Sequence, residues 1–157
     1  MLLGNILLAL AWAAWQGDFS LRTLFTGHVL GYLILLALVK GGVLGPSPYV
    51  GRVSKAMALA GFFLWELVRA NLRLALDVAT PRFHMKPGIV AIDLDATKDS
   101  EILLLAMLIN LTPGSVALDV SPDRKVMYVH VMYIDTPEAA RAEIKNGFER
   151  RVLEVLG

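Results

Sequence analysis

The stretch Gly88-Ile-Val-Ala-Ile-Asp-Leu-Asp95 is the point at which this 157-residue chain changes from long apolar runs to short alternating elements. Val90, Ile92 and Leu94 fall on one face of an extended segment, which predicts a strand with one buried side. Lys86-Pro87 immediately before the stretch cannot continue a helix. The stretch therefore opens a globular domain, which we place at residues 87–157.

Downstream of this strand the sequence predicts a helix, two strands and a second helix. Asp99-Ser100-Glu101 starts the first helix, and Thr112-Pro113-Gly114 ends it and forms a structural motif. Thr136 caps the final helix, with Pro137 in its first turn. The expected elements are a helical body at 102–111, strands at 116–120 and 126–134 joined by a hairpin loop at 121–125, and a helix that runs to residue 156.

The predicted order β-α-β-β-α defines an α+β domain, a ferredoxin-like sandwich truncated before its fourth strand. A right-handed crossover makes the first two strands parallel and leaves both helices on one face of the sheet. The third strand is apolar on both faces, so its other face is expected to pack on the membrane half of the chain or on another protein. In the last helix, Ile144, Phe148, Val152 and Val155 form the apolar stripe, and Glu149 is expected outside it.

The first half of the chain contains two apolar runs, Met1 to Trp15 and Leu24 to Val39, separated by a short turn. Each is shorter than the roughly 20 residues of a comfortable membrane span, but together they predict a transmembrane helical hairpin. A cleaved signal peptide is disfavoured, because the first run has no basic leading region and a second run follows at once. With the loop that follows, the hairpin forms an expected α-helical membrane anchor at residues 1–55.

A segment rich in Gly and Pro, Lys40 to Lys55, is expected to be a loop, and a third helix is expected from Ala56 to Ala79. Glu66, Arg69, Arg73 and Asp77 recur on one face of that helix at spacings of three, four and four. Residues 56–86 are thus predicted to be an amphipathic or tilted helix at the membrane interface, with its linker. This polar stripe is expected to contact a partner subunit or anionic lipid through Arg69 and Arg73. The alternative is that it is only the solvent-facing side of an ordinary amphipathic helix.

The charges are divided unevenly. Residues 1–87 carry eight bases and three acids, a balance of +5, whereas residues 88–157 carry seven bases and eleven acids, a balance of −4. Basic residues near membrane segments favour the cytoplasmic side. Two groups of bases flank the expected third helix: Lys40, Arg52 and Lys55 before it, and Arg69, Arg73, Arg82 and Lys86 towards and after its end. Two spans with an interfacial third helix put both groups on the cytoplasmic side and make the C-terminal domain cytoplasmic. A third span would put one of the two groups outside.

The sequence offers little chemistry. It has no cysteine, no phosphate-binding loop and no nucleophile motif, so no catalytic, cofactor-binding or metal-binding residue is assigned. His28 in the second apolar run is either a proton relay or a residue bonded to a neighbouring helix. His84 and His130 are interpreted as surface and sheet residues, and Asp93 and Asp95 as a solvated strand end. A net charge of +1 argues against nucleic-acid binding.

Several stretches resemble a known family. The most specific are Leu103-Leu-Leu-Ala-Met-Leu-Ile-Asn-Leu-Thr-Pro-Gly114, Leu118-Asp-Val120, Tyr128-Val-His-Val131 and Phe148-Glu-Arg-Arg151. They are similar to the E subunit of the multisubunit Mrp-type (Mnh/Sha-type) Na+/H+ antiporter. The resemblance implies a non-catalytic accessory or assembly subunit in a bacterial or archaeal cell membrane. Its implied partners are the other antiporter subunits, and large polytopic subunits carry the ions.

Two alternatives remain open from the sequence. Related subunits occur in membrane-bound hydrogenase-type complexes, so the parent complex could be of that kind. A membrane-anchored sensory module with a small-ligand-binding α+β domain is the other. An enzyme is disfavoured, because no nucleophile–base or metal constellation is visible.

Overall fold

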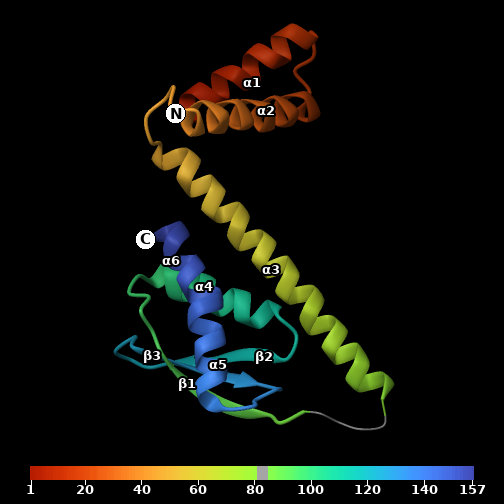
Figure 1. Ribbon diagram of the computed structural model, residues 1–157, viewed down its shortest axis with the longest axis vertical. Coiled ribbons are helices and arrows are strands. Elements are labelled where there is room, and N and C mark those ends of the chain that lie inside the picture. The colour runs from red at the N-terminus through yellow and green to blue at the C-terminus, as the bar shows by residue number, and fades with distance from the viewer. Residues whose placement is uncertain (81–84) are drawn as a thin grey trace. The chain divides into compact units, whose positions relative to one another are not determined.

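A computed structural model describes residues 1–80 and 85–157, so Arg82 and His84 lie outside the described residues. The chain divides into two compact units, Met1–Ser54 and Lys55–Gly157. Figure 1 shows the helices of the first unit and the sheet with its helices in the second. Each unit is described by itself.

The first unit is built on two packed helices, α1 (Leu2–Gln16) and α2 (Leu21–Lys40). Gly17 ends α1 in the left-handed conformation with φ 66°, which glycine adopts without strain. Asp18 accepts hydrogen bonds from the hydroxyls of Thr23 (2.6 Å) and Ser20 (2.7 Å), and these bonds lower the pKa of Asp18. The two helices approach each other closely at Gly27. A Cβ added there would lie only 2.9 Å from the carbonyl oxygen of Ala9.

Among the described residues, α2 is the helix long and apolar enough to cross a membrane by length and composition. The apolar helix α1 has 15 residues. At 1.5 Å per residue it is about 22 Å long, which is less than the roughly 30 Å thickness of bilayer hydrocarbon.

The third helix, α3 (Pro48–Ala79), starts earlier than the sequence predicts. The expectation that Lys40 to Lys55 forms a loop is correct only up to residue 47. Pro48 is the first helical residue, a position at which its fixed φ and missing N–H are tolerated. Gly51 is therefore helical, in open space with nothing within 4 Å of an added Cβ.

A three-stranded antiparallel sheet forms the base of the second unit, in the order β1-β3-β2. Its strands are β1 (Gly88–Asp93), β2 (Ser115–Val120) and β3 (Val126–Val131). Val129 pairs with Val90 of β1 on one side and with Ala117 of β2 on the other. Since both outer strands are antiparallel to β3, β1 and β2 run in the same direction, as predicted, with β3 between them.

Besides the greater part of α3, this unit contains the helices α4 (Asp99–Leu111), α5 (Pro137–Ile144) and α6 (Arg150–Leu156), and a π-helical turn, η1 (Lys145–Glu149), joins the last two. The N-terminus of α5 is as predicted, because the Thr136 hydroxyl accepts from the Ala139 N–H at 3.2 Å. The single uninterrupted α-helix expected up to residue 156 is wrong in one detail, since η1 interrupts it.

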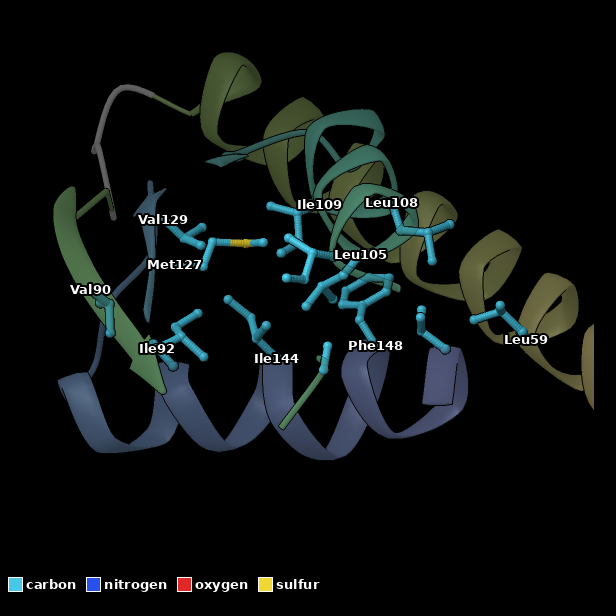
Figure 2. Close-up of a cluster of buried hydrophobic side chains, with 14 residues drawn as sticks. Leu59, Val90, Ile92, Leu105, Leu108, Ile109, Met127, Val129, Ile144 and Phe148 are labelled. Atoms are coloured by element: carbon cyan, nitrogen blue, oxygen red, sulfur yellow. The ribbon is translucent and has the colours of Figure 1, made fainter. Parts of the chain in front are cut away.

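One hydrophobic core joins the sheet to its helices (Figure 2). Side chains of β1, β3, α4, α5 and η1 point into it, and Leu59 of α3 reaches its edge. Among the described residues of this unit, the other face of the sheet has exposed side chains, namely Ile89, Val116, Leu118 and Tyr128. The third strand is thus covered on one face by the helices of its own domain.

Candidate functional site

The polar stripe of α3 faces the α+β domain of its own chain. The guanidinium of Arg69 donates to the Glu143 carboxylate of α5 at 2.6 Å, and its other nitrogen lies 3.6 Å from Glu66. Phe62, one turn before Glu66, packs edge-on against Phe148 with ring centroids 5.2 Å apart. An ion pair and an aromatic contact therefore hold the same helix face on the domain.

The second half of the stripe contacts the segment that follows β3. The Arg73 guanidinium lies 4.2 Å from the centroid of the Tyr133 ring, within the range of a cation–π interaction. Asp77 is 5% exposed. The Asp77 carboxylate is the main cause that raises the pKa of the Tyr133 phenol, and burial is the second cause. The hydroxyl therefore keeps its proton well above neutral pH.

Thr112-Pro113-Gly114 forms the turn between α4 and β2. The Thr112 hydroxyl donates to the Leu108 carbonyl at 2.8 Å and so caps the last turn of α4. Gly114 has φ 89°, and its carbonyl accepts from the Met132 N–H at 2.7 Å. The left-handed backbone of Gly114 thus starts the pairing of β2 with β3.

These two sets of residues, which are far apart in the sequence, meet at one cavity of about 90 Å³. That volume suits a few water molecules, since one water needs roughly 10–15 Å³ of such space. No group of His, Cys, Asp or Glu with metal-ligand geometry occurs in the described ranges 1–80 and 85–157. Chemically, the site is a junction of ion pairs and packing contacts. Its lining includes Glu66, Arg69, Arg73, Thr112, Pro113, Gly114, Tyr133 and Glu143.

A second polar cluster lies in the first unit, and only one of its members, His28, was predicted as a candidate from the sequence. The Asn5 amide nitrogen donates to the Tyr49 hydroxyl at 2.8 Å and lies 3.1 Å from Nε2 of His28. Tyr49 and His28 are themselves 3.3 Å apart. His28 is therefore bonded to neighbouring helices, the second of its two interpretations. The lone polar Asn5 in an apolar run was the available signal, whereas Tyr49 was hidden in the expected loop.

Asn5 is fully buried, and its side-chain oxygen has no hydrogen-bond partner among the described residues. That oxygen sits against Gly31 of α2, where any Cβ would collide with it. The cluster thus depends on glycine at position 31 and fixes α1, α2 and the start of α3 relative to one another.

Two carboxylates are buried although their burial was not predicted from the sequence. Glu149 was expected outside the apolar stripe, but it is 1% exposed. Its Oε1 accepts from the backbone N–H groups of Asp95 (2.6 Å) and Ala96 (3.0 Å). The π-turn η1 changes the direction in which position 149 points, so an α-helical period misplaces it. Asp95, half of the expected solvated strand end, pairs with Lys145 at 3.0 Å.

The second buried carboxylate is Glu101 at the start of α4. It accepts hydrogen bonds from the backbone N–H groups of Thr97 (3.1 Å) and Lys98 (3.2 Å) and pairs with the Lys98 ammonium at 3.0 Å. The bond from Lys98 is the main cause that lowers the pKa of Glu101. Glu101 therefore has a structural role at the helix start.

These features define a class: a small protein with an apolar helical pair and an α+β domain whose polar residues serve packing. Comparison with known proteins gives the family. Residues 5–155 match the model of the Na+/H+ ion antiporter subunit family. The chain belongs to that family, and this confirms the resemblance found in the sequence.

Relatives in several bacteria match over almost their full length. The E subunit of the Na(+)/H(+) antiporter of Bacillus subtilis (strain 168) is 34% identical over 151 residues, which cover 96% of this chain and 94% of the relative. The E subunit of Alkalihalophilus pseudofirmus has the same identity and coverage. The E1 subunit of Staphylococcus saprophyticus is 35% identical over 156 residues, 98% of this chain and 95% of the relative.

Two solved structures share the fold. One is the Mrp complex from Dietzia sp. DQ12-45-1b, in which a chain matches with TM-score 0.51 and 24% identity over 65% of this chain and 96% of its own. The other is the membrane-bound sulfane sulfur reductase, an archaeal respiratory membrane complex. Its chain matches with TM-score 0.57 and 27% identity over 96% of this chain and 95% of its own.

Proposed function

We propose that this member of the antiporter family is a non-catalytic accessory subunit that supports assembly of the complex. The observation that carries this proposal is the use of its polar side chains. Arg69 forms an ion pair with Glu143, and the Arg73 guanidinium lies over the Tyr133 ring. The cavity that these residues line has a volume of about 90 Å³. Ion-translocating residues would need a continuous polar path, whereas these groups hold one helix on one domain.

The proposed topology has two spans, formed by the hairpin at residues 1–55, in a bacterial or archaeal cell membrane. Residues 56–86 lie at the membrane interface, and the domain at 87–157 is cytoplasmic. Packing of α3 on its own domain supports this arrangement, because Leu59, Arg69 and Asp77 all face that domain. Lipid chains cannot surround a helix that is covered in this way, which argues against a third span.

We further propose that the domain is a ferredoxin-like sandwich without its fourth strand. The sheet order β1-β3-β2, with helices on one face, is the order expected for the first three strands of that fold. The fourth strand of that fold, which residues 1–80 and 85–157 do not contain, would lie beside β1. There the side chains of Arg141 and Lys145 donate to the carbonyls of Ala91 (2.9 Å) and Asp93 (2.7 Å).

The partners that fit this role are the other antiporter subunits and membrane lipids, and nucleic acid is not among them. A second candidate is the equivalent subunit of a hydrogenase-type or related respiratory complex. The 27% identity over 96% of the chain to a component of the archaeal sulfane sulfur reductase favours it. A small-ligand sensor fits less well, because the charged side chains that line the cavity of about 90 Å³ are engaged with one another.

The test is purification from native membranes in mild detergent with an affinity tag after Gly157, followed by identification of the bound proteins. We expect large polytopic antiporter subunits in stoichiometric amounts. Hydrogenase or sulfur-reductase subunits in their place would support the second candidate. A monodisperse, well-behaved single chain would contradict both.

A further inference from the structure

The face of α3 that turns away from the domain is an apolar stripe with its large side chains exposed. We define this stripe as Leu64, Trp65, Val68, Leu72 and Leu76, which are 52–65% exposed. Their spacings of one, three, four and four keep them on one side of the helix, and at 1.5 Å per residue they extend over about 18 Å. A contiguous exposed apolar surface of this kind is typical of a site that binds another protein or a membrane.

Nothing polar interrupts the stripe. All four charged residues between Ala56 and Ala79 are Glu66, Arg69, Arg73 and Asp77, the residues of the polar stripe that faces the domain. Asn71 borders the apolar stripe, but its amide donates back to the Leu67 carbonyl of the same helix at 2.7 Å. Burial of the stripe in an apolar medium would therefore leave no charge desolvated and would keep this amide donor bonded.

The charge of the preceding chain indicates which apolar medium covers the stripe. Residues 19–65 contain Arg22, Lys40, Arg52 and Lys55 and no acidic residue, a balance of +4. Arg52 and Lys55 are exposed at the start of the same helix. Counted at about 3.6 residues per turn, Arg52 and Lys55 fall on the polar side of α3, the side away from the apolar stripe. Basic residues on the polar side of a helix, with a tryptophan in its apolar face, are typical of helices that lie in an anionic membrane surface.

We propose that the apolar stripe of α3 is a lipid-binding surface: it lies in the acyl-chain boundary of an anionic bilayer, and Arg52 and Lys55 contact the headgroups. The proposal rests on the proposed interfacial placement of residues 56–86 and adds which face touches lipid and which bases accompany it. The competing occupant is an apolar helix of another antiporter subunit, which would exclude both lipid and water from the stripe.

The sequence of this chain has no cysteine, so each introduced cysteine is the only one in the chain. The unsubstituted complex, treated with the same nitroxide, gives the background from the other subunits. Val68→Cys and Leu72→Cys, each carrying a nitroxide, are prepared in the assembled complex and reconstituted into vesicles that contain anionic lipid. Collision rates are measured with oxygen, which concentrates in hydrocarbon, and with a water-soluble nickel chelate. Lys125→Cys in the exposed β2–β3 loop is the aqueous control, and Leu33→Cys on the exposed face of α2 is the hydrocarbon control.

We expect the ratio of oxygen to nickel collisions at positions 68 and 72 to exceed that at position 125 several-fold and to approach the ratio at position 33. Low collision rates with both reagents would show a protein cover and overturn the proposal, and a ratio like that of position 125 would show exposure to water and overturn it too. Co-purification of the complex is scored on the same samples, so failure of the proposed function is recorded separately.

A second measurement covers the case in which the labelled variants fail to assemble. In a complex whose copy of this chain carries Trp12→Phe and Trp15→Phe, Trp65 is the one remaining tryptophan of the chain. The same complex with Trp65→Phe as well gives the fluorescence of the other subunits, which is subtracted. We expect brominated acyl chains to quench the Trp65 fluorescence strongly, and Arg52→Ala with Lys55→Ala to reduce that quenching in anionic vesicles but not in zwitterionic ones. Absence of quenching in the otherwise natural complex would contradict the proposal.

Discussion

The guanidinium of Arg69 and the carboxylate of Glu143 meet at 2.6 Å, although 74 positions separate them in the chain. The contact ties the middle of α3 to α5, and the edge-on packing of Phe62 against Phe148 lies beside it. Since both charged side chains are about half exposed, the pair sets the position of the helix more than it adds stability.

Arg69→Ala should cost roughly 0.2–1 kcal/mol, the usual range for an exposed ion pair, and should leave the amount of assembled complex near normal. The Arg69→Ala, Glu143→Ala double-mutant cycle, followed by thermal unfolding in detergent, measures the coupling. Loss of ion transport in Arg69→Ala with the complex intact would instead place Arg69 on an ion path.

Reversal of both arginines should have a much larger effect. Arg69→Glu with Arg73→Glu changes the local charge from +2 to −2 and puts two carboxylates beside Glu66, Asp77 and Glu143. We expect release of the subunit from the complex, measured as co-purified protein. The matched control is Lys125→Glu with Arg150→Glu, the same charge change at exposed positions away from α3, which should leave assembly intact.

Gly114 provides a prediction about the backbone. An added Cβ has room, because its nearest neighbours lie at 3.6 Å, so the cost comes from φ 89°. Gly114→Val should destabilise by about 1–3 kcal/mol, the usual cost of a strained backbone conformation, and should lower the amount of complex without changing ion preference. In contrast, Gly51→Ala on the exposed start of α3 should be neutral or stabilising, by up to about 1 kcal/mol. Normal assembly with altered ion selectivity in Gly114→Val would refute the structural role.

The polar cluster of the first unit predicts a stability effect inside the helical pair. Asn5→Ala removes the donor to Tyr49 and His28, and such interhelical bonds in membranes are worth about 0.6–2 kcal/mol. Tyr49→Phe should cost less, because Asn5 and His28 remain in contact. Unfolding midpoints in detergent give both values, with Leu33→Ala on the exposed face of α2 as the control. Equal stability of Asn5→Ala and the natural chain would contradict a stabilising role of this polar cluster.

Glu101 predicts how stability depends on pH. Its pKa is lowered below the ordinary value of 4.5, chiefly by the bond from Lys98, so the folded state favours the ionised form. The stabilisation is complete above that ordinary value and is lost as the pH falls through the lower pKa of the folded state. Glu101→Gln should remove this part of the acid sensitivity of thermal unfolding. The exposed Glu138→Gln should retain it, and an unchanged profile in Glu101→Gln would contradict the assignment.

The sequence predicted elements that depend on local signals. The cap at Thr136, the β2–β3 hairpin and the end of α4 at Thr112-Pro113-Gly114 all follow from turn and capping chemistry within a few residues. The one-sided polar stripe of α3 was also visible, because helical periodicity is a strong signal. What periodicity cannot show is which surface the stripe contacts, and here that surface is the domain that follows it in the chain.

The features that were missed depend on distant parts of the chain. Pro48 starts α3 inside a segment that local composition marks as a loop, and Tyr49 then reaches Asn5 across 44 positions. Glu149 is buried because a π-turn aims it at backbone N–H groups more than 50 residues earlier. A local sequence pattern predicts neither a π-turn nor a hydrogen bond to backbone N–H groups in a distant loop.

If this chain supports assembly and carries no ions itself, transport depends on it only through the amount of assembled complex. Antiport activity divided by the amount of assembled complex tests this dependence most directly, in vesicles prepared from cells that express the natural chain, Gly114→Val, Arg69→Ala or the Arg69→Glu, Arg73→Glu pair. We predict that total activity falls in proportion to assembly and that activity per complex stays constant across the series. A variant with full assembly and greatly reduced activity per complex would contradict the account.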